Sequence, residues 1–514
     1  MTRHLLRALG LALLSAALEA AAQPGNSGLI HQPWFEARTP HFRLFSCGST
    51  QAVVRVATRL EQFHDAYSLL AGAQAVASPP IMVVAFPDYD SMRPFLPLYQ
   101  GQPENLAAFF IRGTDENLIV LHLAGSGTDS LQRIFHEYSH LLMRHNAPYW
   151  PMWLNEGMAE IYAPFEVVGP FRTRIGLPLE HHLELLAHTP MMPLRQLFAV
   201  GRDSPEYNER EQQGVFYAES WLLAHYLMLG GNPYLQAGFR QLTPLLRQGQ
   251  SAEQAFTNAL HTTLPSMEAQ LRRYLEQGRF LPLDLTVGAN LEAQRFAYTR
   301  GLTPAEVCFR LGDELLRIGR LDQAESYFRE AEKVAPASPL PFEGLGLLAA
   351  VRKQPEEAVT FLGQAMQHGQ VSFLAHYVYA QEKYALTSPS PDHFTRLGKE
   401  QAAEIRGELQ KSLALMPDFG PAHDLLGFLE LVQADDLAGA EQHLARAVQL
   451  EPENSGYQLS LAQVQLARRD SAAAWRTLTA LRLPNVDARV RAHAEELLKQ
   501  LDGPGPEPAA RTRR

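Results

Sequence analysis

The first half of the chain alternates short apolar runs with longer amphipathic stretches. Runs rich in β-forming residues at 41–46 (HFRLFS), 81–86 (IMVVAF) and 117–123 (NLIVLHL) predict strands. Apolar residues recur at helical spacing across 51–70, and the same periodicity resumes at Asp129 and dominates to Tyr274. Strands that come first and helices that follow predict an α+β domain with a small sheet and a helical lobe.

From residue 304 onward the sequence repeats itself. Leu311, Gly312, Ala324, Phe328 and Ala331 recur 34 positions later as Leu345, Gly346, Ala358, Leu362 and Ala365. These offsets resemble the tetratricopeptide repeat, a pair of helices that buries its apolar face only by stacking on neighbouring pairs. We expect an all-α solenoid of about four to five repeats over 304–502, with an insert near 387–394. An irregular helical bundle is the alternative.

The remaining segments lack periodicity. Residues 281–303 contain scattered Pro and Gly and are predicted to be a linker, and residues 503–514 (GPGPEPAARTRR) a disordered tail. At the N-terminus, Arg3 and Arg7 accompany an apolar run that ends at Leu18, and three alanines follow. This order predicts a signal peptide over 1–22, with an uncleaved anchor as the alternative. We therefore expect an exported protein, periplasmic or secreted, without a transmembrane span after cleavage.

Composition narrows the class of function. The 514 residues carry a formal net charge of −10, which argues against a nucleic-acid partner, because such proteins usually present a basic surface. Only two cysteines are present, Cys47 and Cys308, and they fall in different predicted domains. We expect both to be free, packed thiols, because a disulfide framework needs more cysteines.

The sequence IFHEYSHLL (134–142) contains the strongest chemical signal. On a helix His136 and His140 are four residues apart, so both imidazoles project from one face within reach of a single ion. Two neutral imidazoles suit zinc, and Glu137 can reach a metal-bound water as general base. One zinc ion per chain would lower the pKa of that water to about 7 and supply a nucleophile at neutral pH.

A third ligand follows in the segment WLNEGMAE (153–160). Glu156 lies 16 residues after His140, far enough for a turn and a returning antiparallel helix. Three protein ligands leave a fourth position open, as a catalytic zinc site requires. Glu160, one turn further on, can accept a hydrogen bond from a ligand imidazole and fix its tautomer. Met143 and Asn146 occupy the positions where a metzincin needs glycine and histidine, which excludes that class.

HEYSH followed by WLNEGMAE resembles the gluzincin metallopeptidases of the thermolysin and aminopeptidase-N type. With the strands HFRLFS and IVLHL, residues 38–280 look most similar to bacterial peptidase-MA-like proteins, which often carry tetratricopeptide repeats. The resemblance implies that His136, His140 and Glu156 are zinc ligands and that Glu137 is the catalytic base and proton shuttle. The position of Tyr217, 61 residues after Glu156, resembles that of the transition-state tyrosine in aminopeptidase-type relatives.

Several other residues have competing interpretations. Tyr217 is either the oxyanion donor or a core residue, with Tyr207 and His225 as less favoured donors. His181 and His182, beside Glu180, are expected on a solvated helix face, because adjacent residues on a helix diverge. His122 is expected to be a packed histidine or a substrate contact, and His145 lies off the ligand face.

Three functions remain open at this point. The main hypothesis is an exported zinc metallopeptidase, with endo- or exopeptidase action undecided, whose repeats bind a protein partner or the peptide substrate. The second is a tetratricopeptide scaffold or assembly factor of the cell envelope with a silent or structural zinc site. The third is hydrolysis of a non-peptide amide by the same residues.

Overall fold

The computed structural model describes residues 27–71, 81–124, 128–146, 150–169, 171–201, 204–208, 210–287, 298–387, 396–482 and 486–502. These residues form two compact units. One runs from Gln32 to Leu302, and the other holds the residues from Thr303 onward together with the short helix α2 (Ser27–Ile30). The predicted signal peptide (1–22), the tail (503–514) and nearly all of the insert near 387–394 lie outside the described residues.

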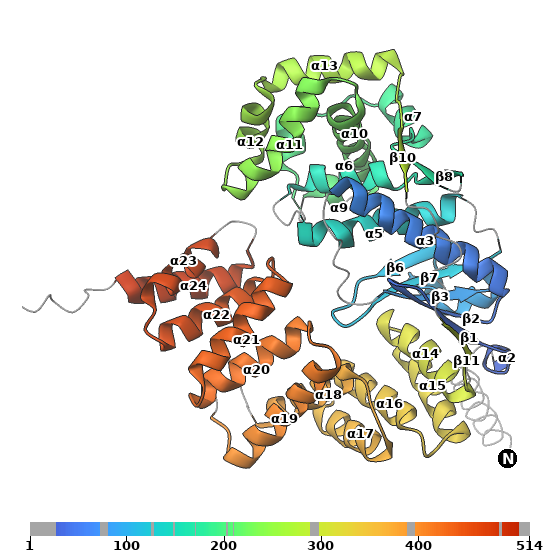
Figure 1. The fold of residues 1–514 in the computed structure, drawn as a ribbon, viewed down its shortest axis with the longest axis vertical. Coiled ribbons are helices and arrows are strands. Elements are labelled where there is room, and N and C mark those ends of the chain that lie inside the picture. The colour runs from blue at the N-terminus through green and yellow to red at the C-terminus, as the bar shows by residue number, and fades with distance from the viewer. Residues whose placement is uncertain are drawn as a thin grey trace, which may run out of the picture. The chain divides into compact units, whose positions relative to one another are not determined.

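A six-stranded sheet with the order β11-β1-β2-β3-β7-β6 organises the first unit (Figure 1). Its strands are β1 (Phe35–Arg38), β2 (Phe42–Ser46), β3 (Ile81–Phe86), β6 (Ala108–Ile111), β7 (Asn117–His122) and β11 (Tyr298–Gly301). The pairs β2–β3 and β3–β7 are parallel and the other pairs are antiparallel. The three strands predicted from apolar runs are confirmed, and they lie side by side as β2, β3 and β7.

The segment 281–303 is not a linker, contrary to the prediction. It contributes β10 (Leu283–Thr286) and β11, and β11 pairs antiparallel with β1, Phe35 facing Gly301. Glu36 explains part of this arrangement: its buried carboxylate contacts Arg38 and Arg43 on the sheet and Arg300 of β11 at 2.7–3.1 Å. The unit therefore extends to Leu302, beyond the predicted domain limits of 38–280.

Two helices pack against this sheet and against each other. Helix α3 (Thr50–Ala71) connects the parallel strands β2 and β3, and α5 (Thr128–Asn146) follows β7. Phe63 of α3 stacks on Phe135 of α5 with ring centroids 4.5 Å apart, and Tyr138 of α5 meets Phe42 of β2 edge-on. The buried face of α5 is thus fixed between the sheet and α3, which leaves its other face for chemistry.

The helical lobe predicted for the later part of this unit is present, with two small sheets in addition. Its helices are α6 (Met152–Tyr162), α7 (Glu180–His188), α8 (Leu194–Ala199), α9 (Pro205–Asn208), α10 (Arg210–Leu229), α11 (Pro233–Arg247), α12 (Ala252–Leu260) and α13 (Leu264–Gln277). The hairpin β8 (Glu166–Gly169) and β9 (Arg172–Ile175) pairs with β10. Helix α4 (Tyr89–Met92), the 3-10 turn η1 (Arg93–Phe95) and the hairpin β4 (Leu98–Tyr99) and β5 (Gln102–Pro103) complete the unit.

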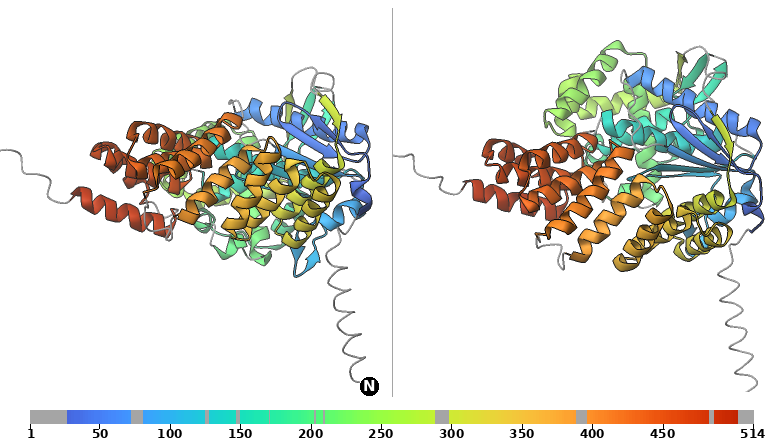
Figure 2. Two further views of the ribbon diagram at one scale, coloured as in Figure 1. Left: turned by 90° about the horizontal axis from the view of Figure 1, so that it is seen from below. Right: turned by 60° about the horizontal axis from the view of Figure 1, so that its bottom comes forward.

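The second unit is an array of helix pairs, as Figure 2 shows. The pairs are α14 (Pro304–Arg317) with α15 (Leu321–Val334), α16 (Pro339–Val351) with α17 (Pro355–His368), α18 (Phe373–Thr387) with α19 (Lys399–Leu415), α20 (Gly420–Gln433) with α21 (Leu437–Leu450), and α22 (Ser455–Ala467) with α23 (Ser471–Ala480). Helix α24 (Ala488–Asp502) follows. The all-α solenoid predicted for 304–502 is therefore present, with five helix pairs in the described residues.

The repeating small residues allow the helices to approach closely. A Cβ added at Gly312 would lie only 2.6 Å from the ring of the fully buried Phe328 of α15, and one at the repeat-equivalent Gly346 only 2.6 Å from Leu362. Gly344 is equally close, because a Cβ there would lie 2.3 Å from the Phe328 ring. Thr303 and Glu306 form a reciprocal capping box that starts α14, and thereby marks the beginning of the solenoid.

The sequence also predicts that both cysteines are free and that the mature chain has no transmembrane span. Cys47 and Cys308 are free, and burial raises the pKa of each thiol to about 12. Within the described part of the chain, no helix combines the length and the apolar character needed to cross a bilayer.

Candidate metal centre

Helix α5 presents the first two candidate ligands. Its apolar residues Ile134, Phe135, Tyr138, Leu141 and Leu142 are buried, whereas His136, Glu137 and His140 are partly exposed. Because helical residues four apart lie one above the other, the packing that buries one face turns both imidazoles to the other.

Helix α6 returns antiparallel to α5 and brings Glu156 opposite the two histidines. Gly157 makes this position possible, because a Cβ there would lie 2.3 Å from the backbone oxygen of Ser220 in α10. The missing side chain allows α6 and α10 to pack almost in backbone contact. Glu156, one residue earlier, is 2% exposed and is held at a fixed depth.

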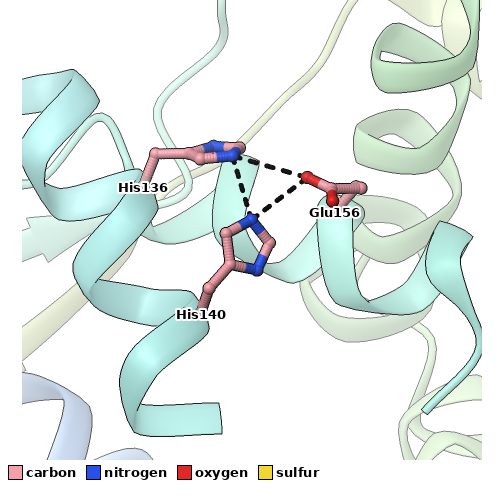
Figure 3. A group of neighbouring side chains, drawn as sticks. All are labelled: His136, His140 and Glu156. Atoms are coloured by element: carbon pink, nitrogen blue, oxygen red, sulfur yellow. Dashed lines mark hydrogen bonds and ion pairs between the residues drawn. The ribbon is translucent and has the colours of Figure 1, made fainter. Parts of the chain in front are cut away.

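The three predicted ligands converge on one point (Figure 3). His140 Nε2 lies 3.1 Å from His136 Nε2 and 3.1 Å from Glu156 Oε2, and His136 Nε2 lies 3.4 Å from Glu156 Oε2. Three donors bound tetrahedrally to one zinc ion at about 2.0–2.1 Å would be about 3.3 Å apart. The nitrogen and oxygen donor set and the size of this triangle both fit zinc.

The far nitrogen of each imidazole also faces an oxygen. His136 Nδ1 lies 3.3 Å from Glu160 Oε1, as the sequence predicted for Glu160 and a ligand imidazole. His140 Nδ1 lies 3.4 Å from Asn155 Oδ1, a contact that the sequence reasoning missed although Asn155 directly precedes Glu156. An oxygen acceptor at Nδ1 keeps the proton there and leaves the Nε2 lone pair for a metal.

Charge is strongly coupled within this cluster. Burial opposes the charged form of His136, but Glu156 and Glu160 outweigh it and raise the pKa of His136 to about 10. Burial likewise opposes ionisation of Glu156, yet the two imidazoles lower its pKa to about 2, and His136 and His182 lower the pKa of Glu160. The carboxylates of Glu156 and Glu160 therefore favour a positive charge at this position.

Two tyrosines border the candidate ligands. The hydroxyl of Tyr207 lies 3.3 Å from Glu156 Oε1, and its ring stacks on Tyr217 with centroids 6.3 Å apart. Tyr217 approaches His136 with ring centroids 6.2 Å apart. Burial, followed by the charge of Glu156 and, more weakly, of Glu137, raises the pKa of Tyr207. Tyr207 and Tyr217 thus both lie at the site, and both also pack against the hydrophobic core of the unit.

Among the described side chains, the other histidines that the sequence singled out are not candidate metal ligands. His225 is buried, with Nε2 3.0 Å from the Gly176 oxygen and Nδ1 2.9 Å from the Tyr274 hydroxyl, so it is not available as an oxyanion donor. His122 packs against the ring of Tyr89. The side chain of His145 lies outside the described residues.

The expectation of a solvated face is correct for His181 and wrong for His182. His181 is exposed, but His182 is 4% exposed, and its Nε2 lies 3.2 Å from Glu160 Oε2. The two rings do not diverge: their centroids lie 4.2 Å apart, with His182 on the buried side of the helix and His181 on the exposed side. The spacing of the two histidines in the sequence could not predict which of them would be buried.

Comparison with known proteins identifies the repeats. The tetratricopeptide repeat family matches residues 305–338, which are α14, α15 and the turn that follows. The match shows a tetratricopeptide repeat at residues 305–338, a type of repeat that typically binds proteins. No curated protein matches the chain.

Solved structures similar to this chain include two described as tetratricopeptide proteins and the protein PilF. YrrB, described as having an unusual peptide-binding site, is 16% identical, with 37% of this chain and 92% of that chain covered and a TM-score of 0.31. A tetratricopeptide protein of Thermus thermophilus is 21% identical, with 38% and 99% covered and a TM-score of 0.29. PilF of Pseudomonas aeruginosa is 17% identical, with 38% and 86% covered and a TM-score of 0.31.

Proposed function

We propose that the chain is an exported zinc metallopeptidase whose repeats bind a protein partner or the peptide substrate. The observation that carries the proposal is the triangle of His136, His140 and Glu156, whose donor atoms lie 3.1–3.4 Å apart. Three ligands leave one coordination position for water or substrate. Export rests on the signal-peptide pattern of residues 1–22.

A zinc ion at this position would act as a Lewis acid and lower the pKa of a coordinated water. The chain's own residues supply the proton transfers. Glu137 follows the ligand His136 on α5 and remains partly exposed, so its carboxylate can accept a proton from the attacking water and return it to the leaving amine. Tyr217 is the proposed donor to the developing oxyanion.

A protein-binding scaffold is the second candidate, and the tetratricopeptide match supports it more directly than it supports catalysis. In that case the three ligands would hold a structural or silent zinc. The chemistry of the site argues for hydrolysis instead, because Glu137 makes no contribution to holding the metal and is nevertheless present beside His136.

Cleavage of a complex peptide mixture distinguishes the two candidates. The full chain is loaded with zinc and incubated with denatured proteins, and new peptide termini are identified by mass spectrometry. We expect new termini with the wild type and with Glu180→Gln, an exposed glutamate on α7 that serves as control. We expect none with Glu137→Gln, although it should hold equal zinc. Equal zinc with no cleavage by any variant would overturn the peptidase and leave the scaffold and the hydrolysis of a non-peptide amide.

A further inference from the structure

His182 lies directly behind the candidate metal centre. Glu160 directs Oε1 to His136 Nδ1 at 3.3 Å and Oε2 to His182 Nε2 at 3.2 Å. The three side chains come from α5, α6 and α7 and are at most 14% exposed. A continuous row of polar groups therefore joins the ligand His136 to a helix that contributes no ligand.

We propose that His182 is a positioning residue of the metal centre that acts through Glu160. The inference rests on the proposed function only as far as zinc binding, and does not require hydrolysis. A glutamate side chain has several rotatable bonds, so one contact to His136 would leave its carboxylate free to turn. A second contact, the ion-pair approach of His182 Nε2 to Oε2 at 3.2 Å, restrains the carboxylate and with it the orientation of the His136 ring.

The packing of His182 gives it a fixed position from which to act. Its helix α7 packs against α10, and its ring lies 6.0 Å from that of the buried Trp221. His181 provides a control for packing, because it is exposed and its ring lies 4.2 Å from that of His182; His181→Ala removes this ring contact and keeps the His182 nitrogen that faces Glu160.

A purely structural role and a positioning role make different demands on the side chain. His182→Phe keeps an aromatic ring beside Trp221 but removes the nitrogen that faces Glu160. His182→Gln loses the ring and retains an N–H donor of similar reach. A packing role therefore predicts that Phe is tolerated better than Gln, whereas the positioning role predicts the opposite order for zinc binding.

Zinc affinity of the full chain, measured by competition with a chromophoric chelator, tests the inference. Loss of such a supporting contact typically weakens metal binding about 10–100-fold, and we expect a loss in this range for His182→Phe. We expect a loss below about threefold for His182→Gln and none for His181→Ala. The visible spectrum of the cobalt-substituted protein should change with His182→Phe and remain unchanged with His181→Ala.

Testing His182→Phe in a protein that also carries Glu160→Ala distinguishes loss of the Glu160 contact from a general defect in folding. In Glu160→Ala, His182→Phe should cause no further loss of affinity, because the intermediary is gone. Wild-type affinity in His182→Phe, or an equal further loss in the Glu160→Ala background, would overturn the inference, as would absence of zinc binding by the wild type. Zinc binding that depends on His182 without peptide cleavage would overturn the peptidase alone and leave the positioning role intact.

Discussion

Glu156 Oε2 lies 3.1 Å from His140 Nε2, although 16 residues and a break between two helices separate them. The contact exists because α5 is fixed by the sheet and α3, while α6 is drawn against α10 at Gly157. The candidate metal centre thus depends on helix packing in the lobe as much as on the candidate ligands themselves.

Gly157→Ala should therefore damage both stability and metal binding. The added Cβ would lie 2.3 Å from the Ser220 oxygen, so α6 and α10 must separate. We expect a loss of about 1–3 kcal/mol in the free energy of unfolding. Urea unfolding followed by tryptophan fluorescence measures it, because every tryptophan except Trp475 lies in the Gln32–Leu302 unit. Gly201→Ala, where no atom lies within 4 Å, is the control and should be nearly neutral. An equally neutral Gly157→Ala would contradict the packing argument.

The two tyrosines should have separable effects. Tyr217→Phe removes the proposed oxyanion donor and should lower kcat about 10²–10³-fold with zinc affinity unchanged. Tyr207→Phe removes the hydroxyl that contacts Glu156 and should weaken zinc binding. Steady-state kinetics and chelator competition on both variants check this assignment. If Tyr207→Phe lowers kcat on that scale while Tyr217→Phe does not, the roles are reversed.

Glu219 predicts a pH-dependent stability. The side chain is fully buried, and burial raises its pKa to about 8 from 4.5. Between these values the folded state keeps a proton that the unfolded state has lost, so the contribution of Glu219 to stability falls as pH rises. Relative to Glu219→Gln, the wild type should lose on the order of 3 kcal/mol between pH 5 and pH 8. Urea unfolding of both proteins at the two pH values measures this difference. A difference that does not change with pH would refute the assignment.

The solenoid should depend strongly on Phe328. The ring is fully buried and fills the space that Gly312 and Gly344 leave open. Phe328→Ala should cost about 3–5 kcal/mol, which circular dichroism during urea unfolding can detect. Trp475→Ala removes an aromatic ring that is 49% exposed, and should change the stability by less than about 0.5 kcal/mol. Similar small effects for both variants would show that the pairs do not stack as described.

The sequence predicts those features that depend on residues close together in the chain, and fails where residues far apart in the chain pair. The approach of His136 and His140 follows from one helical turn, and the strands at 42–46, 81–86 and 117–122 follow from apolar runs. Strand β11 (YTRG) carries no such run, and its partner β1 (FEAR) holds a buried charge that pairs with Arg38, Arg43 and Arg300. Pairing across 264 residues leaves no local pattern.

The supporting residues of the site show the same limit. Glu160 could be predicted because it lies one helical turn after Glu156 on the same helix. His182 could not, because its contact depends on how α7 packs against α10. The contact of Asn155 with His140 could have been predicted from the antiparallel return of α6, which places the Asn155 side chain toward His140.

Reconstitution of the metal-free protein with zinc tests the central claim most directly. The full chain is stripped with a chelator, and its peptide-cleavage rate is followed as zinc is added. We predict that the rate rises in proportion to zinc and reaches its maximum at one equivalent, while Glu137→Gln binds the same equivalent and remains inactive. No cleavage at one equivalent, or the same rate in Glu137→Gln, would contradict the assignment of His136, His140 and Glu156 to the zinc centre of a peptidase.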